Sequence, residues 1–347
     1  MHTYDYLILV MFSIYLFLLN LFFKKINFLI DKNIRTYPHK SFINKSTNLV
    51  PITGGIFILT FIFFFGLEYK YFFLLICILG LFSDLDIIKS PKNRIFFQIL
   101  IVGSLLLIKN IYISEIHIKY FDYLIKNYKY FSLSFSIFCL LILINGSNFI
   151  DGVNSLLSGY FLLVILFLLL AVNKHNLTFN VEFFKLFFSI LFIFFLYNFF
   201  NKSFLGDGGS YLLGAFIGIY LINFYSDNNN VSPYFIMNLL WYPAFENLFS
   251  IIRRFINRHQ TSRPDNLHLH HLIFLFLIRK FKTNIKFISS LVGILINIFN
   301  LIFFYFSIQN IYSSKFQIFL TFSIITIYVT LYFFFLFLNK SIKKINI

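Results

Sequence analysis

The stretch Asn145–Ser155 reads N-G-S-N-F-I-D-G-V-N-S, and a long apolar run lies on each side of it. A turn between two membrane helices needs turn-forming residues, but it does not need three Asn, at 145, 148 and 154, around one Asp-Gly. If the stretch continues as a helical turn, Asn145, Asn148, Asn154 and Asp151 point the same way and form a polar site at a membrane surface. A capped turn, in which Asp151 or Asn154 opens the next helix, explains this stretch alone equally well.

The composition is that of an all-α, polytopic integral membrane protein. Of the 347 residues, 59% are hydrophobic, 12% are charged and 55 are Phe, and apolar runs long enough to cross a bilayer recur from end to end. We expect about eleven spans, or ten, because the third is short. They are placed at 4–23, 50–66, 70–83, 94–109, 129–145, 155–172, 183–200, 209–225, 233–252, 284–306 and 315–338.

The net charge of +16 indicates topology rather than nucleic-acid binding. With the N-terminus outside, the inner segments hold 21 of the 29 Lys and Arg, and the opposite orientation would place these 21 outside. The first apolar run is followed by Lys24-Lys25 and by no small-residue cleavage site, so we expect a retained helix and no signal peptide. Cys77 and Cys139 fall within expected spans, which argues against a disulfide framework or a Cys-based zinc site.

Two acidic segments follow the expected inner ends of spans. Asp84 and Asp86 end an apolar run and are followed at once by several cations. The positive-inside rule explains the cations, but it does not explain the two carboxylates. Asp207 lies among three Gly in Phe204–Ser210, a tight turn with free backbone N–H groups beside a carboxylate. That turn suits a metal-bound phosphate, and a plain helix-helix turn is the alternative interpretation.

The ninth expected span and the inner loop after it carry the other ionisable groups. Glu246 lies within the span, where an ionisable group costs ~2.5–3.5 kcal/mol at the bilayer centre, and it is a functional candidate unless it only pairs with a loop cation. The loop 252–286 carries several Arg and three His within four residues, His268, His270 and His271. Zinc is disfavoured there because no Cys is near, and the basic surroundings favour an anion.

The charge count places Asp84, Asp151, Asp207 and the His cluster on one face of the membrane, although they come from four separate loops. An even number of expected spans separates each consecutive pair. Carboxylates for Mg²⁺ with Arg and His for anions are typical of phosphoryl transfer. A site at the inner bilayer surface suggests one soluble phosphate-containing substrate and one lipid-borne substrate.

The chain resembles the polyprenyl-phosphate N-acetylhexosamine-1-phosphate transferases of glycosyltransferase family 4, which include bacterial initiators of lipid-linked glycans and the lipid I synthase. Four stretches carry the resemblance: Pro51–Gly55 (P-x-x-G-G), Asn145–Gly152 (N-x-x-N-x-x-D-G), Phe204–Gly214 (F-x-G-D-x-G-S-x-x-L-G) and Pro264–His271 (close to P-D-R-x-H-L-H-H). It covers about residues 31–272 of a single membrane domain, 1–347, and 284–338 adds two C-terminal spans.

The resemblance implies a reaction and residue roles. A UDP-N-acetylhexosamine gives its sugar-1-phosphate to undecaprenyl phosphate, forming undecaprenyl-diphosphate-sugar and UMP, with Mg²⁺, or Mn²⁺ as an alternative. It implies Asp84, Asp151 and Asp207 as catalytic residues and Asp207 and Asp84 as metal ligands. The expected substrate-binding residues are Asn145, Asn148, Asn154, Gly208, Glu246, Arg263, Asp265, His268, His270 and His271.

The chain departs from the family pattern at two positions. Ser83 stands where many members have the first Asp of a D-D pair, which questions a mechanism that needs two adjacent carboxylates. Asn266 stands where the P-D-R motif has its Arg. A catalytically weakened member therefore stays an alternative, as does a transporter of anionic sugar-phosphates, although its expected midplane polar groups and internal repeat are not evident.

The expected setting is the bacterial inner membrane with the active site facing the cytoplasm. The expected partners are undecaprenyl phosphate, a UDP-N-acetylhexosamine and the lipid bilayer, with no nucleic acid, and a homodimer is compatible with the sequence. The expected product begins a lipid-linked surface glycan.

Overall fold

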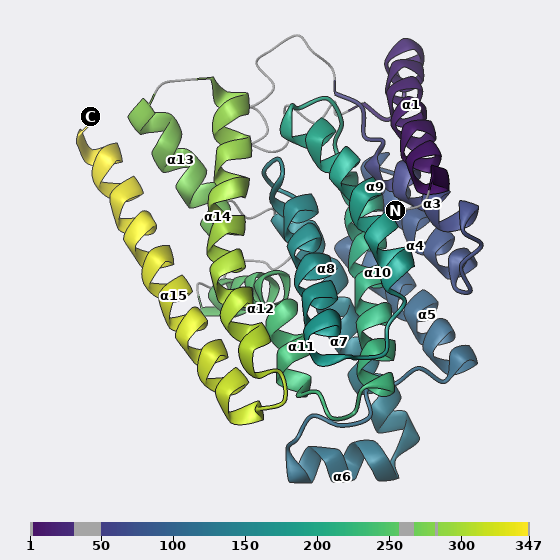
Figure 1. Ribbon diagram of the computed structural model, residues 1–347. Coiled ribbons are helices and arrows are strands. Elements are labelled where there is room, and N and C mark those ends of the chain that lie inside the picture. Colours follow the sequence, from purple (N-terminus) through teal and green to yellow (C-terminus); the bar gives the residue numbers. More distant parts are fainter. Residues whose placement is uncertain (1–2, 31–49, 257–266, 282–283, 346–347) are drawn as a thin grey trace.

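The computed structural model describes residues 3–30, 50–256, 267–281 and 284–345 (Figure 1). These residues form helices and no β-strand, which confirms the all-α expectation. The helices are α1 (Thr3–Ile26), α3 (Gly54–Phe64), α4 (Lys70–Asp84), α5 (Pro91–Lys109), α6 (Lys119–Asn127), α7 (Lys129–Ile150), α8 (Leu156–His175), α9 (Val181–Phe199), α10 (Gly206–Asp227), α11 (Pro233–Leu239), α12 (Trp241–Ile256), α13 (Leu269–Phe281), α14 (Ile285–Ser307) and α15 (Ser314–Ile345).

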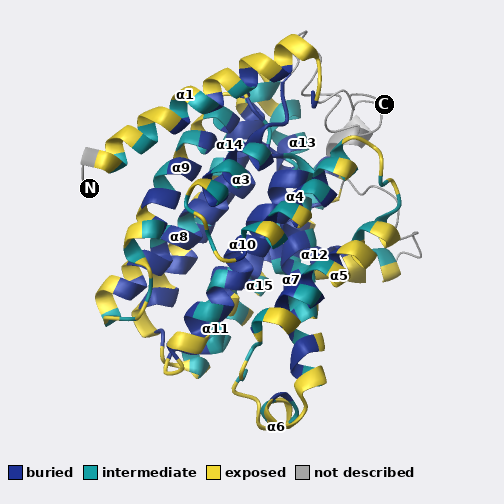
Figure 2. Cartoon of the chain, turned by 90° about the vertical axis from the view of Figure 1, so that its right-hand side faces the viewer, coloured by how far each residue is buried: buried dark blue, intermediate teal, exposed yellow. Residues whose placement is uncertain are grey.

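Helices α8 and α10 form the centre of the bundle, and α1 and α15 lie at its edges (Figure 1). In the most apolar 18-residue stretch of each helix, 78% of the residues of α8 and 89% of those of α10 are buried. The corresponding shares are 22% for α1 and 17% for α15. The exposed side of α1, coloured mostly yellow and teal in Figure 2, carries large apolar side chains such as Leu7 and Phe22. Apolar side chains facing outward on long helices are those of a polytopic membrane protein.

Every expected span coincides with a helix, but not all these helices are long enough to cross a bilayer. Among the described residues, eight helices have the length and composition to cross, or nine if α11 and α12 count as one bent span. The helices at the second and third expected spans, α3 and α4, have 11 and 15 residues. Pro51 and Ile52, before α3, form single β-bridges, Ile52 with Phe204, and the Gly54 N–H donates to the Phe204 carbonyl over 3.0 Å.

The span expected at 233–252 is bent, because α11 and α12 meet at an angle of 76°. Pro243 is the cause. Proline has no N–H and its ring clashes with the carbonyl four residues earlier, which here belongs to Leu239. The backbone at the bend must therefore find other hydrogen-bond partners.

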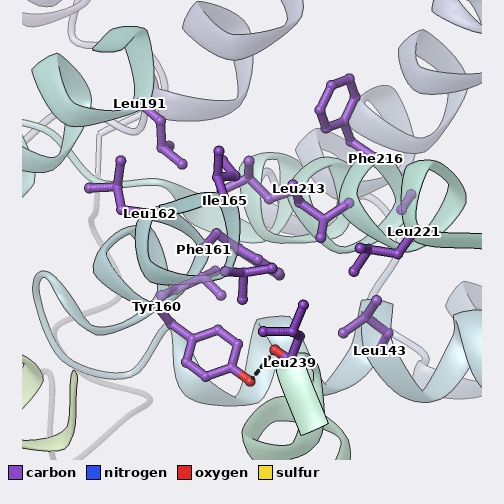
Figure 3. Close-up of a cluster of buried hydrophobic side chains, with 14 of the residues drawn as sticks. Leu143, Tyr160, Phe161, Leu162, Ile165, Leu191, Leu213, Phe216, Leu221 and Leu239 are labelled. Atoms are coloured by element: carbon purple, nitrogen blue, oxygen red, sulfur yellow. Dashed lines mark hydrogen bonds between the residues drawn. The ribbon is translucent and has the colours of Figure 1, made fainter. Parts of the chain in front are cut away.

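Tyr160 of α8 supplies them from inside the apolar core. Its fully buried hydroxyl donates to the Leu239 carbonyl over 2.8 Å (Figure 3). The same hydroxyl accepts the Tyr242 N–H over 3.3 Å. The rings of Phe161, Tyr242 and Phe304 pack against the Tyr160 ring, with centroids 5.8, 6.0 and 5.8 Å from its own. One hydroxyl thus satisfies a carbonyl and an N–H at the bend, and it fixes the direction in which α12 leaves.

Tyr160→Phe should lower the free energy of unfolding by about 1–3 kcal/mol, because it leaves two buried backbone groups unsatisfied. Thermal unfolding in detergent measures this, with Tyr305→Phe as the control because Tyr305 is 55% exposed on α14. Equal melting temperatures for the two variants would show that the Tyr160 hydroxyl does not stabilise the bend.

Two helices occupy segments that the sequence analysis treated as loops. The inner loop expected at 252–286 is wrong in part, since α12 continues to Ile256 and α13 begins at Leu269, inside the His cluster. Short α6 lies between α5 and α7, at the bottom of Figure 1. Both helices were missed because their charged and polar residues lie between expected spans, where such residues are usually part of a loop.

Helices α4 and α10 are in backbone contact at Gly80 and Gly208. A Cβ atom on Gly80 would lie 2.5 Å from the Asp207 carbonyl oxygen and from the Gly208 nitrogen, which is closer than real Cβ atoms come. Only glycine therefore allows this approach. It brings the end of α4 to the start of α10.

Candidate active site

The carboxylate of Asp84, the last residue of α4, caps the start of α10. Its Oδ1 accepts the Asp207 N–H over 3.0 Å, and its Oδ2 accepts the Gly208 N–H over 3.1 Å. The first N–H groups of a helix have no partner within the helix and carry partial positive charge, so a carboxylate there is favourable. Both Asp84 oxygens thus bind the backbone that positions Asp207.

Asp207 itself is held by Ser83 and Arg94. The Ser83 hydroxyl donates to Asp207 Oδ2 over 2.6 Å, and Arg94 Nη1 donates to the same oxygen over 3.2 Å. Arg94 Nη1 also donates to the Ser83 hydroxyl oxygen over 2.7 Å. The side chains of Arg94 and Asp207 are 23% and 26% exposed, so this ion pair can be reached from solvent.

The end of α7 lies beside the start of α10. Asn148 Oδ1 accepts the Ser210 hydroxyl over 3.3 Å. Asp151 directly follows the helix, and its N–H donates to the Asn148 carbonyl over 3.3 Å. Asn148 and Asp151 therefore lie at the same helix ends as Asp207.

The expectation that all three Asn point the same way is wrong. Asn145 Nδ2 donates to Gln98 Oε1 over 2.8 Å, whereas buried Asn154 donates through Nδ2 to Asn201 Oδ1 over 3.2 Å. The reason is that α7 ends at Ile150, so Asn154 no longer follows the helical spacing. Asn145 and Asn148 lie in α7, whereas Asn154 lies in the turn before α8, and the residue at the N-cap of α8 is Ser155, not Asp151 or Asn154.

The His cluster is built on Glu246 of α12. Glu246 is fully buried, and its Oε2 accepts His268 Nδ1–H over 3.0 Å while its Oε1 accepts the Leu269 N–H over 3.2 Å. The carboxylate thus caps α13 and orients the first His at the same time. Glu246 holds His268 from within the protein, where His268, His270 and His271 are buried as well, and its expected role in substrate binding stays a prediction.

Gly152 connects the residues at the end of α7 with the His cluster. A Cβ atom on Gly152 would lie 2.5 Å from His270 Nε2 and 2.7 Å from His271 Nε2. The ring of Phe149, one turn earlier in α7, has its centroid 5.4 Å from that of His268. The residues after α7 therefore lie between the aspartates of α4 and α10 and the histidines of α13.

Part of the chain is similar in sequence to known proteins. Residues 68–225 match the model of the family described as glycosyl transferase family 4. Over 149 residues the chain is 32% identical to the undecaprenyl-phosphate alpha-N-acetylglucosaminyl 1-phosphate transferase of Thermotoga maritima. Over 85 residues it is 39% identical to the probable undecaprenyl-phosphate N-acetylglucosaminyl 1-phosphate transferase of Bacillus subtilis.

The residues that match the family model, 68–225, make up less than half of the chain. The first match covers 42% of this chain and 44% of the relative, and the second covers 24% of each protein. The chain therefore matches less than half the length of both relatives. Asp84, Asp151 and Asp207 lie within the family region 68–225, and the His cluster lies beyond it. Contacts of Phe149 with His268 and of Gly152 with His270 and His271 bring the His cluster to the end of α7.

The donor set around Asp207 fits a Mg²⁺ ion that takes most of its ligands from substrate. Among the described residues, no three His, Cys, Asp or Glu side chains gather as a metal site. Mg²⁺ is usually bound through one or two carboxylates, with phosphates and waters as its other ligands. Asp207 can provide the carboxylate, beside the Ser83 hydroxyl. Asp84, expected as the second ligand, contacts the α10 backbone through both oxygens, and its metal role stays a prediction.

Sequence reasoning missed the positions of Arg94 and Arg254. Arg94 was explained by the topology rule, although Ser83, directly before Asp84 and in place of an Asp, was the signal that a different partner is needed. The Arg254 guanidinium lies over the Phe149 ring, 5.7 Å from its centroid, and so faces the end of α7. Arg263 and Asp265, expected to bind substrate, lie outside the described residues.

Asp84→Asn should lower the free energy of unfolding by about 1–2 kcal/mol, because the neutral amide keeps only one acceptor oxygen for two charge-assisted bonds. Asp86→Asn is the matched control, two residues away on an exposed turn, and should change stability by less than about 0.5 kcal/mol. Chemical or thermal unfolding of the detergent-solubilised variants measures both, and equal stabilities would remove the capping role.

Proposed function

We propose that the protein transfers a sugar-1-phosphate from a UDP-N-acetylhexosamine to undecaprenyl phosphate, and so begins a lipid-linked cell-surface glycan. A phosphate oxygen of the lipid attacks the β-phosphorus of the donor, and the bond from that phosphorus to the bridging oxygen breaks. The products are undecaprenyl-diphosphate-sugar and UMP. The family region and the names of the two relatives support this reaction.

The observation that carries the proposal is the contact of Gly152 with His270 and His271. It joins one side, made of the histidines with Arg254 nearby, to an anionic side made of Asp207 and Asp151. Transfer of a phosphoryl group depends mainly on positioning and on neutralising charge, so both sides are needed at one place. A transporter of sugar-phosphates has no need of this meeting of helix ends.

Each side has a stated role in the proposed reaction. A Mg²⁺ ion bound at Asp207 would neutralise charge on the donor diphosphate and act as a Lewis acid. His270 and His271 would contact the donor's phosphates or sugar, with His268 fixed by Glu246. Asn148 and Asp151 would line the nucleotide-sugar pocket. Asp84 would hold the start of α10 and so place Asp207.

We also propose that this site faces the cytoplasm from the bacterial inner membrane. The support is the charge asymmetry of the sequence, since 21 of the 29 Lys and Arg lie on the expected inner side. A nucleotide-activated sugar is a soluble donor made inside the cell, and the lipid phosphate reaches the site from the bilayer.

The direct test uses purified protein in detergent with undecaprenyl phosphate, Mg²⁺ and a panel of UDP-N-acetylhexosamines, and measures release of UMP. We expect release with at least one donor and its loss on adding EDTA. Asp207→Asn should abolish release, whereas Asp227→Asn at the other end of α10 should keep it. Failure of every donor, or near-normal turnover of Asp207→Asn, would contradict the proposal.

Gly152→Ala should lower turnover by at least about a hundredfold, because the new methyl group displaces the His270 and His271 rings, and misplacement by about 1 Å has effects of this size. Gly103→Ala is the matched control, since its Cβ would meet only the Ile137 side chain, at 3.3 Å. Thermal unfolding run alongside checks that both variants are folded. Equal turnover of the two variants would show that the histidines do not take part.

A further inference from the structure

Arg94 and Ser83 form a three-centre contact with Asp207 that the proposed reaction does not require. One guanidinium nitrogen of Arg94 donates both to Asp207 Oδ2, over 3.2 Å, and to the Ser83 hydroxyl, over 2.7 Å. The Ser83 hydroxyl in turn donates its own proton to Asp207 Oδ2 over 2.6 Å. The same carboxylate oxygen therefore accepts two hydrogen bonds, one of them from a full positive charge.

This contact has a consequence for charge. The two carboxylates at this end of α4 and α10 are those of Asp84 and Asp207, and Asp84 binds the backbone N–H groups of α10. The proposed function takes Asp207 as a cation ligand, and Arg94 already compensates its charge. A guanidinium this close repels a divalent ion on either oxygen of Asp207, and the partial exposure of the pair weakens but does not remove the effect.

We propose that Arg94, fixed by Ser83, is a counter-ion latch on Asp207 that weakens the binding of a divalent cation to the substrate-free protein. This inference rests on the proposed function, because it takes Asp207 as the cation ligand. A cation that arrives with the donor diphosphate brings negative charge that can pair with Arg94, so the latch favours binding of the cation and the donor together. Arg94 is in this sense a positioning residue.

The latch can be tested by binding of Mn²⁺ alone, without nucleotide, lipid or turnover. The free ion gives an electron paramagnetic resonance signal that is lost on binding, and purified protein in detergent is titrated. Arg94→Gln should bind Mn²⁺ at least about tenfold more tightly than the wild type, a difference of about 1.4 kcal/mol. Arg94→Lys keeps the charge and should remain within about threefold of the wild type.

Two further variants separate the latch from a general effect of charge. Lys92→Gln removes a positive charge from the same helix, two residues away at an exposed position, and should change Mn²⁺ affinity by less than about threefold. The tenfold gain of Arg94→Gln should vanish when Asp207→Asn is also present, because the two residues act on one site.

The outcomes are distinct. Unchanged affinity in Arg94→Gln, an equal gain in Lys92→Gln, a gain that persists with Asp207→Asn, or no Mn²⁺ binding by any variant would each overturn the latch. None of these results depends on UMP release. Failure of the proposed function would instead be seen as no UMP from the wild type with any donor.

Discussion

Backbone contact between α4 and α10 at Gly80 and Gly208 is the constraint on which the rest of the site depends. Because the two helices touch without side chains between them, Asp84 at the end of α4 reaches the first N–H groups of α10. This capping by Asp84 fixes the start of α10, and it therefore fixes which side chains lie beside Asp207. Ser210, in the first turn of α10, then binds Asn148 at the end of α7.

The second half of the site depends on a break in a helix. Pro243 ends the regular hydrogen bonding of α11, and the Tyr160 hydroxyl satisfies the backbone groups left at the bend. The new direction of α12 places Glu246 inside the protein, where its carboxylate can hold both His268 and the start of α13. A buried carboxylate is costly unless its oxygens are bonded, so this arrangement needs its partners in place. The bend therefore serves the site as well as the fold.

Some of this could be predicted from the sequence and some could not. Apolar runs indicated the membrane helices, and Asp84, Asp151 and Asp207 stood out because carboxylates are rare at the ends of such runs. The bend at Pro243, the start of α13 within the His cluster and the contact of Arg94 with Asp207 were missed. Each depends on tertiary contacts: a Tyr from α8 at the bend, a Glu from α12 at the start of α13, and a Ser in place of an Asp beside Arg94. Local pattern does not report such contacts between distant segments.

The central claim is that these helix ends form one site that moves a phosphate together with a sugar. The most direct measurement uses a UDP-N-acetylhexosamine labelled with ³²P at the β-phosphorus, together with undecaprenyl phosphate and the purified protein. Our account predicts that the label passes into the lipid extract while the released UMP carries none. If the label stays in water-soluble UDP while the sugar reaches the lipid, the protein transfers the sugar alone, and the account is contradicted.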